Sequence, residues 1–286
     1  MDTNPRHLVT TSLLSDYFEQ VPLSAAPEFP YVLRDIVDRH GVDTYLPLMP
    51  DEIEVAANLR ERGDLPKHMA LLGPPPKGSA LCADKWLLAR ELDMHSIPTP
   101  RTALASEPFP SETYFLKPRL GAGSRGAKLI GARELRAATE EGGDDWIVQE
   151  RCVPPEVTVD AFHCALSGVS QTVCRERIEV KSGVATKCRL FADRQLNDYA
   201  IAIAKMLGFE GSFCFQVMRS PGDWVVTDVN PRPGAGSAMS NLSGNDFFAA
   251  SFARAWGEGI ERFFAPLREE LWVTRQYAEF AMGTPA

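Results

Sequence analysis

Several patterns that would define the class of this protein at once are missing from its 286 residues. No apolar run approaches the roughly 20 residues of a membrane-spanning helix, and residues 1–6 lack the charged and apolar regions of a signal peptide. We therefore expect a cytoplasmic protein with no membrane partner. The six cysteines include no C-x-x-C pair, which argues against a zinc site or a disulfide framework. The five histidines show neither metal-ligand spacing nor a Ser or Cys partner for nucleophilic catalysis.

A surplus of positive charge is also missing. The chain has 30 Lys and Arg against 38 Asp and Glu, for a net charge of −8, which argues against nucleic acid as a partner. A polyanionic ligand would therefore need a locally basic pocket. The 44% hydrophobic content is that of an ordinary globular protein, and the length suffices for one large or two modest domains.

The first third of the chain predicts a parallel α/β layer. Short strands at 45–48 and 69–72 are each followed by a helix. Asp51 is placed to cap the first helix, with Glu54 in position for a capping box. The second helix is expected over residues 79–95, where prolines follow it.

From about residue 99 onward the pattern changes to strands mixed with helices, which predicts an α+β arrangement. The helix expected over 193–207 has one apolar stripe made of Leu196, Ala200, Ile203 and Leu207. Further helices are expected at 132–140 and 246–256, and strands at 114–117, 127–130, 146–150, 157–164, 169–178, 212–218 and 224–229.

The end of the last predicted strand has the composition of a metal and phosphate site. Asp228 and Asn230 are two residues apart, so a strand places them on one face, and both offer the oxygen ligands that Mg²⁺ prefers. Arg232 follows, where a planar cation can bind phosphate. Taken alone, the segment fits equally well a strand that ends in a polar turn.

Gln216 strengthens the metal interpretation through the expected hairpin. If the loop is 221–223, Ser220 pairs with Trp224, and Gln216 then lies directly across from Asp228. A buried cluster of Gln, Asp and Asn is unfavourable unless something satisfies it. A metal ion is the natural candidate.

A glycine-rich segment lies between the strands at 114–117 and 127–130. Its glycines allow backbone N–H groups to approach a phosphate closely, and three cations add positive charge in an acidic protein. The spacing fits neither a Walker A loop nor a dinucleotide fingerprint, and a plain β-hairpin with a glycine turn is the alternative. The residues are Lys117, Arg119, Gly121, Gly123, Ser124, Arg125 and Gly126.

Two glutamates and one lysine complete the set of candidate binding residues. Glu150, at the end of a strand, could accept a hydrogen bond from an adenine amino group, and Glu156 could accept from ribose hydroxyls. The alternative is that both are solvated at a strand end. Lys85, on a predicted helix, would ordinarily be a surface lysine.

Taken in order, these segments resemble the ATP-grasp superfamily, most closely its carbamoyl-phosphate-synthase-like branch. The resemblance extends from about Asp84 to Trp256 and depends on the order and spacing of the motifs rather than on any one of them. The motifs are 83–85, 97–100, 115–126, 148–150, 156–160, 211–217 and 228–234.

The resemblance implies a fold of mixed α/β and α+β class, in which two α+β lobes clamp ATP. The expected domains are a shortened parallel α/β domain at 1–83, an ATP-grasp domain at 84–262 with a lid at about 101–149, and a C-terminal tail at 263–286. No glycine precedes Gly41, although such enzymes generally open with a glycine-rich turn, so the first strand and helix are expected to be missing or altered. An open sheet of this kind favours pairing with a second copy or with a partner subunit.

For the nucleotide, the resemblance implies that Lys85 and Lys117 bind the phosphates under a flap. Glu150 would meet the adenine amino group, with the backbone of Arg151 and Val153 at the ring edge, and Glu156 would meet the ribose. The flap residues implied are Gly121, Gly123, Ser124 and Gly126.

For the chemistry, the resemblance implies Mg²⁺ or Mn²⁺ at Gln216, Asp228 and Asn230, and Arg232 at the γ-phosphate or at the acyl phosphate made from it. Arg232 and Lys117 are the expected catalytic residues. The family usually has Glu at the position of Asp228, so the resemblance leaves open whether one or two metal ions bind.

The implied activity is an ATP-dependent carboxylate–amine ligase that acts on small molecules. The alternatives are an ATP-binding subunit that is non-catalytic or needs a partner, and a kinase that stops at an acyl or carbamoyl phosphate.

Overall fold

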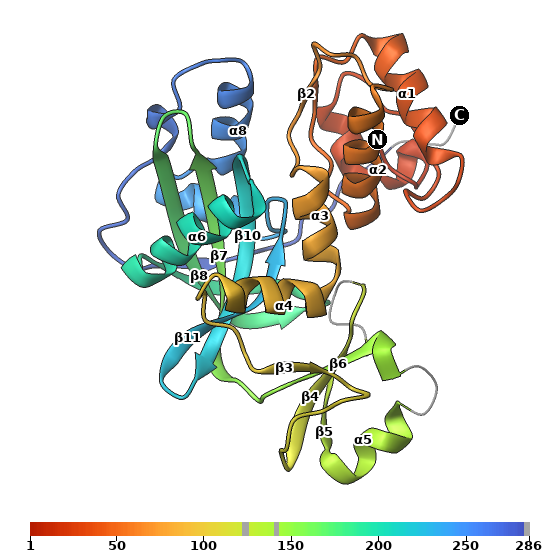
Figure 1. Cartoon of the computed structure of the whole chain (residues 1–286). Helices are drawn as coiled ribbons and strands as arrows, with labels where there is room; N and C mark the ends of the chain where they lie inside the picture. Colours follow the sequence, from red (N-terminus) through yellow and green to blue (C-terminus); the bar gives the residue numbers. More distant parts are fainter. Residues whose placement is uncertain (122–125, 140–142, 283–286) are drawn as a thin grey trace. The chain divides into compact units, whose positions relative to one another are not determined.

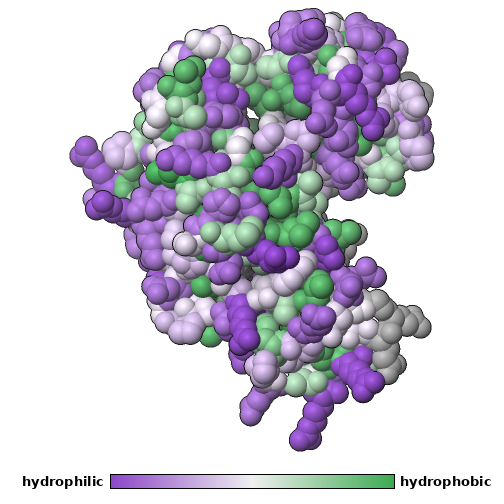
Figure 2. All heavy atoms as spheres, viewed as in Figure 1, coloured by the Kyte–Doolittle hydropathy of each residue, from purple (hydrophilic) through white to green (hydrophobic). Residues whose placement is uncertain are grey.

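The computed structural model describes residues 1–121, 126–139 and 143–282 (Figure 1). The chain folds into two compact units: residues 1–72 with the segment from Arg275 onward, and residues 73–274. We call them the smaller and the larger unit. Among the described residues, no helix is both long enough and apolar enough to cross a bilayer. Hydrophilic and hydrophobic residues are interspersed over the face of the molecule shown in Figure 2.

The smaller unit contains the expected parallel strands, but each is only two residues long. Thr44 pairs with Ala70, and Tyr45 pairs with Leu71. The elements are two short 3-10 helices, η1 (Arg6–Leu8) and η2 (Thr10–Leu14), helices α1 (Phe29–His40) and α2 (Pro50–Arg62), and strands β1 (Thr44–Tyr45) and β2 (Ala70–Leu71).

The start of α2 corrects the predicted cap. The N-cap is Met49, one position before Pro50, and Asp51 lies inside the first turn. Glu52, not Glu54, closes the cap, because its carboxylate accepts from the backbone N–H of Leu48 at 2.9 Å and of Met49 at 3.0 Å. Proline at the first helical position, where its missing N–H would have no partner anyway, sets this start.

The larger unit is built on a six-stranded antiparallel sheet in the order β11-β10-β7-β8-β9-β12. Strand β12 was not predicted, and it places part of the expected C-terminal tail in this sheet. The strands are β7 (Val153–Cys164), β8 (Val169–Lys181), β9 (Val184–Phe191), β10 (Gly211–Ser220), β11 (Asp223–Asn230) and β12 (Leu271–Thr274).

The two faces of this sheet have different roles. On β7, Val157 and Val159 point to a core that contains helix α6 (Arg194–Leu207), whose predicted apolar stripe is buried. Thr158, which alternates with them, lines a cavity on the other face. Farther along that face, helix α8 (Phe247–Ala255) packs on an apolar core.

A second, four-stranded sheet in the order β3-β6-β4-β5 is formed by the residues expected to make the lid (Figure 1). Helix α5 (Ala132–Ala138) packs against it and is shorter than predicted. The strands are β3 (Thr102–Leu104), β4 (Thr113–Pro118), β5 (Lys128–Gly131) and β6 (Trp146–Gln149).

The helix predicted over 79–95 is in fact two helices. Helix α3 (Pro76–Ala83) ends at Asp84, whose extended backbone, with φ −104° and ψ 102°, makes it the N-cap of α4 (Lys85–Met94). Because a capping aspartate lies where the sequence alone suggests continuity, Lys85 becomes the first residue of a helix. This break places its side chain in the site described below.

Candidate functional site

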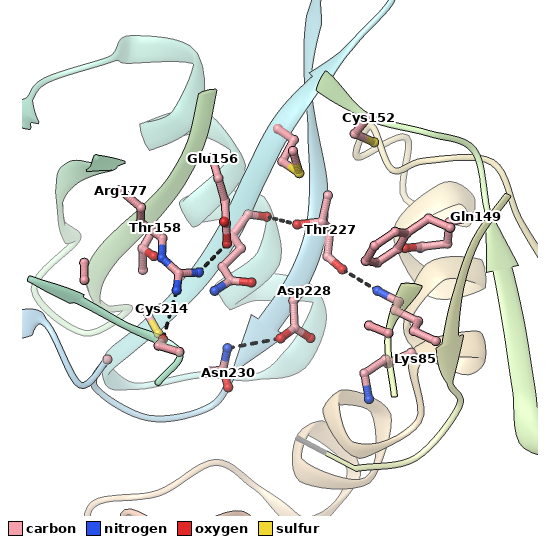
Figure 3. Close-up of a pocket in the computed structure, with 18 of the residues that line it drawn as sticks. Lys85, Gln149, Cys152, Glu156, Thr158, Arg177, Cys214, Thr227, Asp228 and Asn230 are labelled. Carbon is pink, nitrogen blue, oxygen red and sulfur yellow. Dashed lines mark hydrogen bonds and ion pairs between the residues drawn. The ribbon is translucent and has the colours of Figure 1, made fainter. Parts of the chain in front are cut away.

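A cavity of about 660 Å³ is lined by both sheets of the larger unit and by the start of α4 (Figure 3). It brings together most of the residues predicted from the sequence. Gly126 and Val153 do not line it, and Gly123 and Ser124 lie outside the described residues. The predicted residues that do line it are Lys85, Lys117, Gly121, Glu150, Arg151, Glu156, Gln216, Asp228, Asn230 and Arg232.

The predicted pairing of Gln216 with Asp228 is present, but the hairpin reaches it in another way. Ser220 pairs with Asp223, so the loop has two residues instead of three. A β-bulge next to Gln216 then leaves Thr227 as the extra residue on β11 and shifts the register by one. The wrong loop and the missed bulge compensate each other, and Gln216 faces Asp228.

The oxygen donors at this end of the cavity suit a hard divalent cation. Asn230 donates from Nδ2 to Asp228 Oδ2 at 3.4 Å, so the two side chains are neighbours (Figure 3). One carboxylate and two amides are the ligand types that Mg²⁺ accepts, with phosphate oxygens completing the shell. Among the described residues, no three His, Cys, Asp or Glu side chains form a metal cluster. One carboxylate and two amides thus fit a cation whose remaining ligands would be phosphate oxygens.

Two lysines line the cavity without an acidic partner at ion-pair distance among the described residues. Lys117 is only 8% exposed and donates from Nζ to the carbonyl of Thr227 at 3.1 Å. The pKa of Lys117 is lowered to about 8, mainly by burial and with a contribution from Lys85, while Asp228 opposes the shift. Burial also lowers the pKa of Lys85. One buried and one partly buried ammonium group are thus well placed to receive an anionic ligand.

The end of β4 holds Lys85 in place. Asp84 accepts through Oδ1 from two backbone N–H groups of α4 and through Oδ2 from Arg119, with Nε at 2.8 Å and Nη2 at 2.7 Å. The backbone N–H of Lys85 donates to the carbonyl of Arg119 at 3.1 Å. Its Nζ donates to the carbonyl of Gly121 at 2.5 Å. The glycine-rich segment and the phosphate-type lysine are therefore joined through Asp84 and Arg119.

Replacing Asp84 by asparagine tests this connection. Asparagine caps a helix as well as aspartate does, but it loses the charge-assisted hydrogen bonds that Asp84 Oδ2 accepts from Arg119. We expect less than about 1 kcal/mol loss of stability, since the pair is partly exposed. ATP affinity should fall by roughly 3- to 10-fold, since Lys85 is held less firmly.

Calorimetric ATP titration and thermal unfolding measure the two effects. Arg262→Gln, which breaks the exposed pair with Glu258, is the matched control. Wild-type ATP affinity in the Asp84 variant would show that Lys85 does not depend on this pair.

The two predicted glutamates are already bound by neighbours that the sequence did not reveal. Glu150 Oε1 accepts from the hydroxyl of Ser220 at 2.7 Å, and its other carboxylate oxygen has no protein donor among the described residues. Glu156 forms an ion pair with Arg177, which also donates to the carbonyl of Gly183 at 2.9 Å. Glu156 is therefore not a free carboxylate, and a ribose bound there would meet an ion pair.

Sequence reasoning missed several cavity residues on strands β7, β8 and β10. Side chains alternate along each of these strands, as they do at Asp228 and Asn230. Following that alternation along the full length of each strand would have placed the missed residues on the cavity face. They are Thr158, Arg175, Arg177, Cys214 and Met218.

The two thiols in the cavity are not activated. Burial, with a contribution from Glu150, raises the pKa of Cys152 to about 11. Burial, with Asp160 contributing, raises that of Cys214 to about 12. Both stay protonated at neutral pH, so neither is poised as a nucleophile.

Comparison with known proteins identifies the family. Residues 82–236, more than half of the chain, match the ATP-grasp domain. The chain therefore belongs to the ATP-grasp family, as the order of its motifs predicts. A comparison with curated proteins finds no match.

Solved structures show the same fold at low sequence identity. The biotin carboxylase domain of Hydrogenobacter thermophilus 2-oxoglutarate carboxylase, in complex with MgADP and bicarbonate, has a TM-score of 0.69 and 15% identity. The match covers 91% of this chain and 63% of that one. N5-carboxyaminoimidazole ribonucleotide synthetase from Thermotoga maritima has a TM-score of 0.68, 15% identity, and coverage of 92% and 70%.

L-amino acid ligase from Bacillus licheniformis has a TM-score of 0.67 and 16% identity, with coverage of 86% of this chain and 64% of that one. The chain thus spans less than two thirds of this ligase and of the carboxylase domain. At these identities the likeness establishes the fold.

Proposed function

We propose that the protein is an ATP-dependent ligase that activates a small carboxylic acid as an acyl phosphate and joins it to an amine. The observation that carries the proposal is the convergence of Lys85, Lys117 and Asp228 on one cavity between two sheets of the ATP-grasp fold. Cations and a metal-type carboxylate around one space match the triphosphate and its metal.

The nucleotide would lie with its base toward Glu150 and its phosphates toward α4. The free oxygen of Glu150 can accept from the adenine amino group, and the backbone of Arg151 borders the same end of the cavity. Lys85 and Lys117 would hold the phosphates, with Lys85 exchanging the carbonyl of Gly121 for a phosphate oxygen. Gly123, Ser124 and Gly126 stay in the proposal as flap residues, and Val153 stays as a backbone contact.

At the other end, Gln216, Asp228 and Asn230 would hold Mg²⁺ or Mn²⁺. Such an ion would neutralise charge on the phosphate oxygens. Arg232 would bind the phosphoryl group during transfer. Arg232 lines the cavity, and its Nη1 donates to the carbonyl of Pro233 at 3.0 Å.

The reaction has two steps. A carboxylate oxygen of the acid attacks the γ-phosphorus, and the bond from that phosphorus to the bridging oxygen breaks to release ADP. The amine then attacks the acyl carbon, phosphate leaves, and the amine loses a proton to give an amide. The chain must exclude water from the acyl phosphate, and the lid sheet over the cavity suits that task. The names of the relatives, two carboxylating enzymes and an amino acid ligase, fit this class of chemistry.

The test is acceptor-dependent ADP release. Purified protein with Mg²⁺ and ATP is given a panel of carboxylic acids, amino acids and bicarbonate, each with and without amines. Release of ADP and phosphate that depends on both acceptors is expected. ADP release that stays at the no-acceptor level across the panel would contradict the ligase assignment.

The same experiment separates the two alternatives. Phosphorus NMR that shows an accumulating acyl or carbamoyl phosphate, to which no amine has been joined, would indicate a kinase. ATP binding without turnover would indicate a nucleotide-binding subunit. The two-residue strands of the smaller unit favour that subunit as the second candidate, since a partner chain could extend so small a sheet.

A further inference from the structure

A buried ion pair lies against the loop that follows β11. Arg175 on β8 donates from Nε and Nη2 to the two carboxylate oxygens of Asp160 on β7, at 3.1 and 3.2 Å. The side chains are only 4% and 2% exposed. Neither residue belongs to the phosphate, metal or base contacts described above, yet Arg175 lines the same cavity.

The carboxylate of Asp160 also binds the far end of this loop. Ser237 Oγ donates to Oδ1 at 3.0 Å, and Ser240 Oγ donates to Oδ2 at 2.6 Å. These serines bound the short helix α7 (Ser237–Ser240) and are themselves buried. Asp160 thus accepts four hydrogen bonds, two from β8 and two from the loop.

The loop backbone runs directly over the pair. A Cβ atom added to Gly236 would lie 2.3 Å from Nη1 of Arg175, and one added to Gly234 would lie 3.0 Å from Oδ1 of Asp160. Side chains at these positions would displace the pair or the loop. The close approach therefore depends on glycine at 236, while a side chain at 234 would need the pair to shift by only a few tenths of an ångström.

The energetics favour a positioning role over a purely stabilising one. Burying two charges is expensive, and apolar replacements of similar volume are often as stable as a buried ion pair. The pair is neutral overall, so it adds no net charge to the cavity. It does provide a rigid, directional attachment for residues 231–240, a segment without long regular structure.

We infer that Asp160 and Arg175 are a positioning pair that holds this loop so that Arg232 faces the cavity. The inference rests on the proposed function for the role of Arg232. The pair acts through the loop and touches no reacting atom. Its effect on the reaction is therefore on the rate of transfer rather than on nucleotide binding, which the lysines govern.

The experiment weakens the attachment without removing a buried charge. The double variant Ser237→Ala, Ser240→Ala removes both loop hydroxyls from Asp160. Ser251→Ala is the control, since Ser251 is also buried and bonded, to Phe247 and Ser212, but lies outside the cavity. Hydrogen exchange of the amides of residues 237 and 239, which bond to Gly234 and Gly236, reports on the loop. ADP release gives kcat and KM.

In the double variant, exchange at these two amides should accelerate about tenfold, and kcat should fall roughly 5- to 20-fold with KM for ATP changed less than about twofold. The control should match wild type in all three. Faster exchange with wild-type kcat would show that the pair holds the loop but does not affect the reaction. Unchanged exchange would show that the pair does not hold the loop. If the double variant does not fold, Ser237→Ala alone is measured against the same outcomes.

If the wild-type protein releases no ADP with any acceptor, the proposed function is wrong. The positioning pair would then be judged by exchange and by Mn²⁺–ATP affinity: faster exchange with unchanged affinity is expected, and unchanged exchange or a large loss of affinity would overturn it.

Discussion

Asp228→Ala is expected to abolish metal-dependent ADP release, with a loss in kcat of at least about 100-fold. Asp228 is the single carboxylate among the three proposed metal ligands, and the two amides carry no charge to replace it. The fold should be nearly unaffected, within about 1 kcal/mol, because the side-chain hydrogen bond lost among the described residues is the 3.4 Å bond from Asn230. Activity assays over a range of Mg²⁺ and Mn²⁺ concentrations, together with thermal unfolding, measure both effects.

Asp223→Ala is the matched control for this variant. It removes an exposed carboxylate from the other end of the same strand and should leave turnover unchanged. A second variant, Asp228→Asn, keeps the shape and removes only the charge, and it should fail in the same way. Wild-type turnover in either Asp228 variant would refute the metal assignment.

Lys117→Met is expected to weaken ATP binding by roughly 10- to 100-fold. The methionine keeps most of the length and the burial but removes the ammonium that faces the cavity. Lys128→Met, on the neighbouring strand β5, removes an exposed lysine and should bind ATP normally. Unchanged ATP affinity in the Lys117 variant would contradict its role at the phosphates.

Lys117→Met should also change how the stability of the protein depends on pH. The folded pKa of Lys117 is lowered by burial to about 8 from 10.5, so between these values the unfolded chain binds more protons than the folded one. Stability from this group therefore rises with pH across that window, by up to about 3 kcal/mol. Lys117→Met should lack the rise. Urea unfolding at pH 7.5 and 9.5, compared among wild type, Lys117→Met and Lys128→Met, measures it. An equal rise in all three would show that Lys117 is not destabilised by burial.

The sequence predicted many of the side chains that line the cavity, largely because its motifs keep their order along the chain. Asp228 and Asn230 follow from strand alternation alone. The pairing of Gln216 came from a hairpin whose loop was one residue too long, and a bulge at Thr227 corrected the difference. Bulges depend on how two strands pack and twist together, so alternation within one strand does not reveal them.

The residues that the sequence did not reveal are those whose role depends on tertiary packing. Arg175 and Arg177 on a strand look like solvated cations until Asp160 and Glu156 on the neighbouring strand are placed opposite them. The break at Asp84 was missed because the apolar pattern continues through it, and only the capping geometry shows that a new helix begins. The short strands β1 and β2 likewise depend on packing, since two residues carry too little pattern to define their ends.

The most direct measurement is a crystal structure of the protein with a non-hydrolysable ATP analogue and Mn²⁺, using the anomalous signal of manganese. The account predicts an anomalous peak within coordination distance of Gln216, Asp228 and Asn230, with phosphates at Lys85 and Lys117 and the base beside Glu150. A nucleotide bound outside this cavity, or a manganese peak away from Asp228, would contradict it.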